Sequence, residues 1–207
     1  MYRKNTLILF AKAAQICNVK TRMYPALTHR ECLYLHKQSI DHFIKQFKDK
    51  FNLVFYTTHT GQYSIPVKEQ CGIDLGVRML NAMKEELKDS ERVVLIGSDC
   101  LQLDIEYVNK AFSSLQSVRD IVLGPANDGG YFLIGANRVS PSLFHNVSWG
   151  TSGVLTKTLM NIADLGWNAK ILDALIDVDT FEDLLALQKL NALPNWARNF
   201  VEAKHIA

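Results

Sequence analysis

Ionisable side chains of opposite charge stand beside separate apolar runs in this sequence. Cationic residues follow the first run, and carboxylates follow later runs or precede the last helical pattern; these residues are Lys12, Lys20, Arg22, Asp99, Asp128, Asp177 and Asp179. Lysine and arginine bind phosphate oxygens, and carboxylates bind Mg²⁺ or Mn²⁺, which bridges to the same phosphates. The residue types therefore indicate a site for phosphate and a metal ion, provided that the fold brings them together.

Each of these groups also has a plainer interpretation. The basic residues of the first loop fit a solvated surface, and Asp99 fits a cap of a turn or helix. Asp177 and Asp179 fit a turn before a helix whose N-cap is Thr180. The segment GPANDGG, residues 124–130, fits a hairpin turn, although Asp-Gly alone would be enough for one. The functional interpretation is favoured because all four groups are predicted to lie at one edge of a sheet.

The elements that must position these side chains alternate along the chain. Unbroken apolar runs predict strands at 7–10, 53–56, 93–96, 121–123 and 131–134, the first of them buried on both faces, and a further short strand is predicted at 169–172. Apolar residues at helical spacing predict helices at 28–51, 75–87, 104–115, 154–165 and 180–190. Thr28 with Glu31, and Thr180 with Asp183, have the spacing of capping boxes at two helix starts.

This alternation predicts an α/β fold with a mostly parallel sheet flanked by helices, and one domain spanning residues 1–207. Ligands of open parallel sheets bind beyond the carboxyl ends of the strands. The residues that directly follow the strands are therefore the ones that we expect to form a site.

Composition excludes several other classes of protein. The 207 residues include 23 basic and 21 acidic ones, a net charge of +2, which is too balanced for a nucleic-acid partner. The apolar run after the N-terminus is cut by Lys12 and is too short for a signal peptide, and no run is long enough for a membrane span.

The four cysteines form no CxxC motif and indicate reduced thiols and a cytoplasmic location. His29, His36 and His42 are interpreted as a solvated helix face, and a homodimer is compatible with the sequence.

Seven motifs in one order carry a resemblance to a known family. They are FAK at 10–12, VKTRM at 19–23, DLGVRM at 74–79, IGSDC at 96–100, LGPANDGGYFLIG at 123–135, SWGT at 148–151 and DVDTFEDL at 177–184. Together they resemble the bacterial GT-A-fold transferases called glycosyltransferase-like or radical-SAM/selenodomain-associated transferases. That family is distantly similar to nucleotidyltransferases that make molybdopterin dinucleotides, 2-phospho-lactate guanylyl adducts and activated sugars. The resemblance extends from the first strand to about residue 190 and implies a GT-A (nucleotide-diphospho-sugar transferase) fold.

The resemblance also implies roles for residues that bind the donor. Asp99 matches the acid that holds the divalent metal, Mg²⁺ or Mn²⁺, at a strand end, and Asp179 matches the second metal ligand. The residues that match the family's nucleotide-binding positions are Lys12, Lys20 and Arg22, expected at the phosphates, and Asp74, Gly76 and Arg78, expected near the base or sugar.

On the acceptor side, the resemblance implies that Asp128 is the catalytic carboxylate. The matching acceptor-binding residues are Asn127, Gly129, Gly130, Trp149 and Thr151. The two glycines would let the backbone approach a ligand closely while Asp128 presents its carboxylate to it.

The first loop departs from the family pattern. The family reads F-x-K-x-P-x-x-G-x-V-K-T-R-L, whereas Ala14 replaces the proline and Cys17 the glycine in this chain. Glycine in such a loop lets backbone amides face an anion at close range, so Cys17 and Asn18 place side chains there instead. Leu101 and Phe181 replace two further prolines, changes that concern local rigidity.

The leading hypothesis is a metal-dependent, glycosyltransferase-like transferase that uses a nucleotide or nucleotide sugar. One alternative is a nucleotidyltransferase that releases pyrophosphate from a nucleoside triphosphate. Another is a non-catalytic protein that binds a nucleotide or a partner through a degenerate first loop. A dinucleotide-dependent oxidoreductase is disfavoured because no G-x-G-x-x-G follows the first strand.

Overall fold

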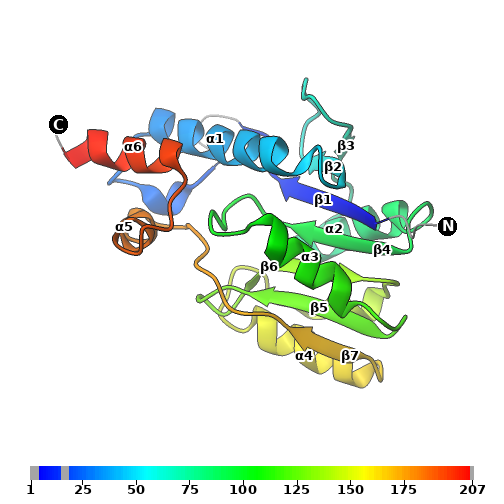
Figure 1. Ribbon diagram of the computed structural model, residues 1–207. Coiled ribbons are helices and arrows are strands. Elements are labelled where there is room, and N and C mark those ends of the chain that lie inside the picture. The colour runs from blue at the N-terminus through cyan, green and yellow to red at the C-terminus, as the bar shows by residue number, and fades with distance from the viewer. Residues whose placement is uncertain (1–4, 15–18, 206–207) are drawn as a thin grey trace.

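The computed structural model describes residues 5–14 and 19–205, which form one seven-stranded sheet with helices on both faces (Figure 1). The strands are β1 (Asn5–Ala11), β2 (Asn52–Thr57), β3 (Val67–Glu69), β4 (Arg92–Ile96), β5 (Asp120–Pro125), β6 (Tyr131–Ala136) and β7 (Asn168–Ile171). Their order is β3-β2-β1-β4-β6-β5-β7, and only β6 runs antiparallel to its two neighbours. The prediction of a mostly parallel α/β sheet is confirmed.

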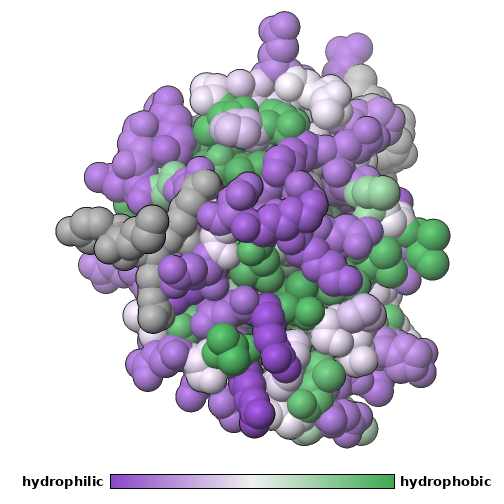
Figure 2. All heavy atoms as spheres, turned by 90° about the vertical axis from the view of Figure 1, so that its right-hand side faces the viewer, coloured by the Kyte–Doolittle hydropathy of each residue, from purple (hydrophilic) through white to green (hydrophobic). Residues whose placement is uncertain are grey.

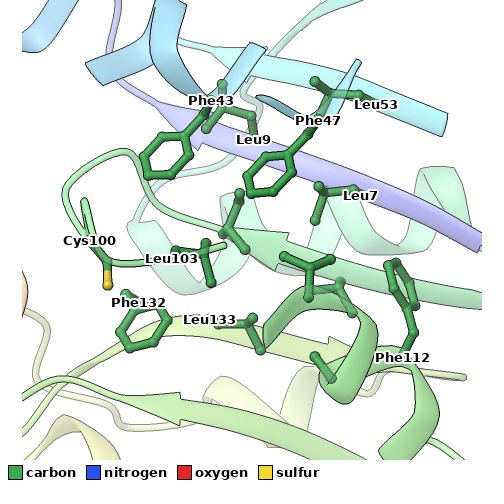
Figure 3. Packing of buried hydrophobic residues seen from close by; sticks show 14 of the residues in the cluster. Leu7, Leu9, Phe43, Phe47, Leu53, Cys100, Leu103, Phe112, Phe132 and Leu133 are labelled. Atoms are coloured by element: carbon green, nitrogen blue, oxygen red, sulfur yellow. The ribbon is translucent and has the colours of Figure 1, made fainter. Parts of the chain in front are cut away.

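The helices cover both faces of the sheet because the inner strands are apolar on both sides. They are α1 (His29–Phe47), α2 (Leu75–Glu86), α3 (Ile105–Ser114), α4 (Val154–Asp164), α5 (Phe181–Lys189) and α6 (Asn195–His205), with short 3₁₀ helices η1 (Thr21–Met23) and η2 (Pro141–Phe144). One core cluster joins alternate strand residues to α1 and α3, and Figure 3 shows Phe43 and Phe47 packed on Leu7 and Leu9. A second cluster joins the intervening strand residues to α2 and α4.

A third core cluster lies beyond the sheet, where α5, α6, η1 and α1 pack together. It includes Met23 of η1 and Val178, which are both almost completely buried. In Figure 1, α6 lies beside α1. This cluster fixes the loop that carries Lys20 and Arg22 against the segment that carries Asp179. No helix was predicted at α6, although the cluster depends on it.

Helix starts follow the side-chain caps that the sequence predicts. Thr28 caps α1 in a capping box with Glu31, and Thr180 caps α5 in a second box with Asp183. The carboxylate of Asp183 accepts hydrogen bonds from the backbone N–H groups of Thr180, at 2.7 Å, and Asp179, at 3.1 Å. The cap of α5 therefore orients Asp179, which lies directly before the N-cap residue Thr180.

Loss of the second capping box should lower stability measurably. Thr180→Ala removes the hydroxyl that accepts from the Asp183 N–H, so we expect the free energy of unfolding to fall by about 1 kcal/mol in urea denaturation. Thr180→Ser keeps a hydroxyl at this position and should retain most of that stability. An equal loss in both variants would show that the cap does not contribute.

The right-hand side of the molecule in Figure 1, where β1 and β4 begin, has a largely hydrophilic surface (Figure 2). Hydrophobic residues interrupt it in separate patches. Within residues 5–14 and 19–205, no helix has the length and apolar character needed to cross a membrane.

Candidate functional site

The loops after β1 and β4 enclose a cleft at the carboxyl edge of the parallel strands, which lies on the left in Figure 1. The cleft has a volume of about 430 Å³. We call it the basic cleft; its ionisable lining residues are Lys12, Lys20, Arg22, His36, Arg78, Asp99 and Asp179. The chain thus brings together six of the residues predicted for the metal and the nucleotide, from segments far apart in the sequence.

Two ion pairs join the first loop to the carboxylates. Lys20 Nζ donates to Asp99 Oδ1 at 2.7 Å and to the carbonyl oxygen of Val178 at 3.0 Å. Arg22 donates to Asp179 Oδ2 at 2.6 Å. The Lys20 side chain is only 6% exposed, and its backbone is left-handed with φ 49°, a conformation that costs energy for a residue with a side chain. These two hydrogen bonds hold the ammonium group against Asp99.

Asp177 was among the carboxylates that the sequence placed at the predicted edge, but it was not predicted to be a metal ligand. Its Oδ1 is buried and has no hydrogen-bond partner among the described residues. Burial raises the pKa of Asp177 well above its usual range, and the neighbouring charges of Asp99 and Asp179 raise it further. The only sequence signal for Asp177 was its spacing of two residues from Asp179, which places both side chains on one extended segment.

The three carboxylates respond differently to their surroundings. Burial raises the pKa of Asp179, and the charge of Asp99 adds to this effect. Burial would also raise the pKa of Asp99, but Lys20 and His36 beside it hold that pKa below its usual value. A positive charge at this point is therefore strongly favoured by the protein, because three acidic groups share a small volume.

The interpretation of the histidines as a solvated helix face is wrong for His36. This side chain is 4% exposed, and its Nε2–H donates to the carbonyl oxygen of Lys12 at 2.9 Å. Burial lowers the pKa of His36 despite the nearby Asp99. His36 lies on the wall of the basic cleft and ties the beginning of the first loop to α1. Cys17 and Asn18, the other residues singled out in this loop, lie outside the described residues.

Asp74 and Gly76 act within α2 rather than on the wall of the basic cleft. Asp74 is the N-cap of α2, and its carboxylate accepts from the Val77 N–H at 2.8 Å. Gly76 is buried under Trp149, where an added Cβ would lie only 2.7 Å from the indole ring. Arg78 lines the cleft while its Nε donates to the Gly72 carbonyl oxygen.

The segment from Ala126 to Gly130 is a turn between β5 and β6. Asn127 and Asp128 are exposed on it and line a second cavity. Gly129 has φ +89°, and a methyl group there would overlap the carbonyl oxygen of Ser152. The close backbone approach that this glycine permits is therefore to the protein's own chain. Gly130 donates its N–H to Asp128 Oδ1 at 2.9 Å.

Trp149 and Thr151 serve the packing of the segment behind this turn. Trp149 is half-buried and contacts the rings of Tyr131 and Phe144. Thr151 donates its hydroxyl hydrogen to the Ser148 carbonyl oxygen at 2.8 Å. Neither residue lines the two cavities that meet at Asp179.

The second cavity has a volume of about 420 Å³ and shares only Arg22 and Asp179 with the basic cleft. We call it the acidic cavity; its lining residues are Arg22, Asn127, Asp128, Ile176, Asp177, Asp179, Thr180, Asp183 and Ala186. A smaller apolar cavity of about 160 Å³ opens beside Asp99 and Asp177, between β1, β4, β6 and α2. Asp99, Asp177 and Asp179 therefore each line two of these three cavities, which adjoin one another at the carboxylates.

The donor set at this junction is chemically suited to a hard divalent cation. Carboxylate oxygens are the ligands that Mg²⁺ and Mn²⁺ prefer, and the buried Oδ1 of Asp177 lacks a partner. Among the described residues, no group of three or more acidic, histidine or cysteine side chains is already arranged to hold an ion. Lys20 and Arg22 currently neutralise two of the three carboxylates.

Comparison with solved structures shows which class this fold belongs to. A protein from Desulfovibrio desulfuricans G20 with the provisional assignment of nucleotide-diphospho-sugar transferase is 26% identical and has a TM-score of 0.87, over 98% of this chain and 95% of that one. The fold is that of the nucleotide-diphospho-sugar transferases.

The family model described as "Uncharacterized protein conserved in bacteria (DUF2064)" matches residues 34–151, and the chain belongs to this family. No curated protein matches it.

Two cytidylyl-transferring enzymes share the fold at much lower identity. CMP:2-keto-3-deoxy-manno-octonic acid synthetase, complexed with CTP, has a TM-score of 0.55 at 8% identity, over 91% of this chain and 98% of that one. The 4-diphosphocytidyl-2C-methyl-D-erythritol synthase of Anaerococcus prevotii DSM 20548 has a TM-score of 0.53 at 10% identity, over 97% and 99%. At these identities the similarities show a shared fold.

Proposed function

We propose that this protein is a transferase that binds a nucleotide-activated donor in the basic cleft, most simply a nucleoside diphosphate sugar. The observation that carries the proposal is the pairing of Lys20 with Asp99 and of Arg22 with Asp179 at one strand edge. Cations and carboxylates alternate there over a short distance, as binding of phosphates together with a metal ion requires. The similarity to a protein assigned to the nucleotide-diphospho-sugar transferases supports this choice of donor.

We propose further that Asp99, Asp177 and Asp179 hold Mg²⁺ or Mn²⁺ when the donor binds. The ion would neutralise charge on the phosphates and on the departing nucleotide. The Lys20 ammonium group lies against Asp99 where positive charge is favoured, and it would turn toward the phosphates in the complex. Asp128 faces the acidic cavity and would orient the acceptor's hydroxyl group.

Nucleotidyl transfer is a second candidate reaction, supported by the shared fold of the two cytidylyl-transferring enzymes. In that reaction the donor is a nucleoside triphosphate and pyrophosphate is released. In sugar transfer the released group is a nucleoside diphosphate. The released product therefore separates the two reactions in a coupled assay for pyrophosphate.

Thermal denaturation tests the proposal directly. A ligand that binds only the native state raises the melting temperature, so nucleoside diphosphates, triphosphates and nucleotide sugars are screened with and without Mg²⁺ or Mn²⁺. We expect a nucleotide to raise it and the metal to increase the effect. Absence of a response to every nucleotide would contradict the proposal, and binding without turnover would indicate the non-catalytic alternative.

Removal of one cation should affect phosphate recognition selectively. Lys20→Ala or Arg22→Ala should weaken the binding of a nucleoside diphosphate by about 1.5–3 kcal/mol, the value of a charge-assisted hydrogen bond, and hardly change that of the nucleoside. Isothermal titration measures both affinities. Lys110→Ala, which breaks an exposed ion pair with Asp173 elsewhere, is the matched control. Equal affinities in all variants would show that Lys20 and Arg22 only pair with the carboxylates and do not bind phosphate.

A further inference from the structure

The apolar cavity between β1, β4, β6 and α2 has no role in the function proposed so far. Its volume is about 160 Å³, and the residues that line it are hydrophobic or aromatic except for Gly97, Asp99 and Asp177. Two of the hydrophobic ones, Leu95 and Ile134, are paired neighbours on β4 and β6, and both belong to the core cluster that packs against α2. A hydrophobic wall thus extends from the core of the protein to the carboxylates.

Gly97 lies at the junction of the apolar cavity and the basic cleft, because it lines both. It follows β4 directly, and its N–H donates to the Phe132 carbonyl oxygen at 2.9 Å, so the pairing of β4 with β6 continues through it. Side chains alternate along a strand, so a side chain at position 97 would point to the same face of the sheet as Leu95, where the apolar cavity lies. The absence of a side chain here therefore leaves space where the two cavities adjoin.

The chain itself does not require a glycine at this position. The backbone of Gly97 does not have the positive φ that favours glycine. Apart from its chain neighbours, the nearest described atom to an added Cβ would be the Phe132 carbonyl oxygen at 3.8 Å, an ordinary van der Waals contact. Gly76 differs, because a Cβ there would overlap the ring of Trp149. The space that a side chain at Gly97 would occupy is therefore empty of protein and open to a ligand.

The size and the lining of the apolar cavity define what fits it. A dry apolar cavity of roughly 150 Å³ holds one benzene molecule. The hydroxyl groups of a sugar would lose hydrogen bonds to water there, because side chains such as Phe10, Met79 and Ile134 offer no partners. The charged residues of the lining are Asp99, which also lines the basic cleft, and Asp177, which also lines the acidic cavity. A ligand would thus place its polar part at the carboxylates and its apolar part in the cavity.

We propose that the apolar cavity is a subsite for a compact apolar group of the substrate, about the size of one benzene ring, and that Gly97 is the residue that admits it. This inference rests on the proposed function, which places the phosphates and the metal ion at Asp99. The group is carried on an oxygen atom beside the phosphates, and it belongs either to the donor or to the acceptor. The chemistry that the cavity recognises is the same in both cases.

Two small alcohols test the subsite on the protein without nucleotide. Benzyl alcohol carries one aromatic ring, whereas glycerol carries hydroxyl groups and no apolar group, and the binding of each is measured by isothermal titration. We expect benzyl alcohol to bind about tenfold more tightly than glycerol, or better, because burial of one ring of this size has an effect of that order. Equal affinities of the two alcohols would overturn the inference.

Substitutions of Gly97 test where benzyl alcohol binds. Gly97→Ala and Gly97→Val fill the junction, so the affinity should fall in the first variant and by about tenfold or more in the second. Without ligand, Gly97→Ala should melt no lower than the wild type, because the new methyl group meets no strain. Unchanged affinity in the variants that fold would contradict the proposal.

The matched control is Gly153→Ala. Gly153 also has a negative φ, −87°, an added Cβ there would lie 3.7 Å from Thr151 Oγ1, and it lines none of the three cavities. Its replacement should leave the affinity for benzyl alcohol at the wild-type value. A loss equal to that in Gly97→Ala would show that the effect does not arise at the junction, and would count against the subsite.

Titrations with phosphate compounds identify which substrate carries the apolar group. Benzyl alcohol that still binds when a nucleoside diphosphate and Mg²⁺ saturate the basic cleft assigns the group to the acceptor. Tighter binding of benzyl phosphate than of inorganic phosphate, with this gain lost in Gly97→Val, assigns it to the donor. Exclusion of benzyl alcohol by the nucleotide, with no gain for benzyl phosphate, would overturn the assignment to a substrate group. A wild-type protein that binds benzyl alcohol but no nucleotide would show that the proposed function alone has failed.

Discussion

Asp99→Asn is expected to abolish the metal-dependent part of nucleotide binding while leaving the protein folded. Asparagine keeps the size of the side chain and an oxygen that accepts from Lys20 Nζ, but it removes the charge shared with Asp177 and Asp179. At a ligand concentration about 100 times the dissociation constant, the ligand-induced stabilisation of about 2.7 kcal/mol should fall to the value measured without Mg²⁺. Thermal denaturation with nucleotide, with and without Mg²⁺, measures this loss.

The outcome separates a metal site from an ion-pair network. If Asp99 only pairs with Lys20, its replacement frees that ammonium for phosphate, and nucleotide binding should become stronger and independent of Mg²⁺. If Asp99 holds the ion, binding with Mg²⁺ should fall to the level without it. The control is Asp164→Asn, because Asp164 is exposed at the end of α4 and lines none of the three cavities; it should behave like the wild type in both conditions. Full Mg²⁺ dependence in Asp99→Asn would contradict the assignment of the metal site.

The sequence was sufficient to predict the framework that positions the site. The inner strands are recognisable from their apolar runs, and the starts of α1 and α5 from their N-cap residues Thr28 and Thr180. Both the apolar run and the cap are local signals in the sequence. Because parallel strands end at one edge, Lys20, Asp99 and Asp179 could be predicted to come together. The structure places all three on the walls of the basic cleft.

Features that depend on tertiary packing could not be predicted in the same way. Strand β3 has only three residues, and it is recognisable only from its pairing with β2. Histidine is common on helix surfaces, so nothing in the sequence indicated that His36 is buried. Its partner, the Lys12 carbonyl oxygen, belongs to a distant segment of the chain. The glycines after Asp128 correctly predicted a close backbone contact. The sequence did not show that Gly129 makes this contact with Ser152 rather than with a ligand.

Gly129→Ala should be the most destabilising single substitution in the acceptor side of the site. The left-handed φ of +89° already disfavours a side chain, by roughly 1–2 kcal/mol. The added methyl group also overlaps the Ser152 carbonyl oxygen, and forced overpacking of this kind costs about 1–3 kcal/mol more. We expect a total loss of several kcal/mol in the free energy of unfolding, measured by urea denaturation.

Gly166→Ala separates the two contributions. Gly166 also has a positive φ, +64°, but an added Cβ there would meet nothing within 4 Å. It should therefore show only the backbone part of the cost, and the difference between the variants gives the cost of displacing Ser152. Because the Gly129 carbonyl oxygen also accepts from the Leu155 N–H at 2.9 Å, this displacement should also move the neighbouring Asp128, which the proposed function places at the acceptor. Equal stability of the two variants would mean that the turn shifts freely, and that the contact with Ser152 does not fix the position of Asp128.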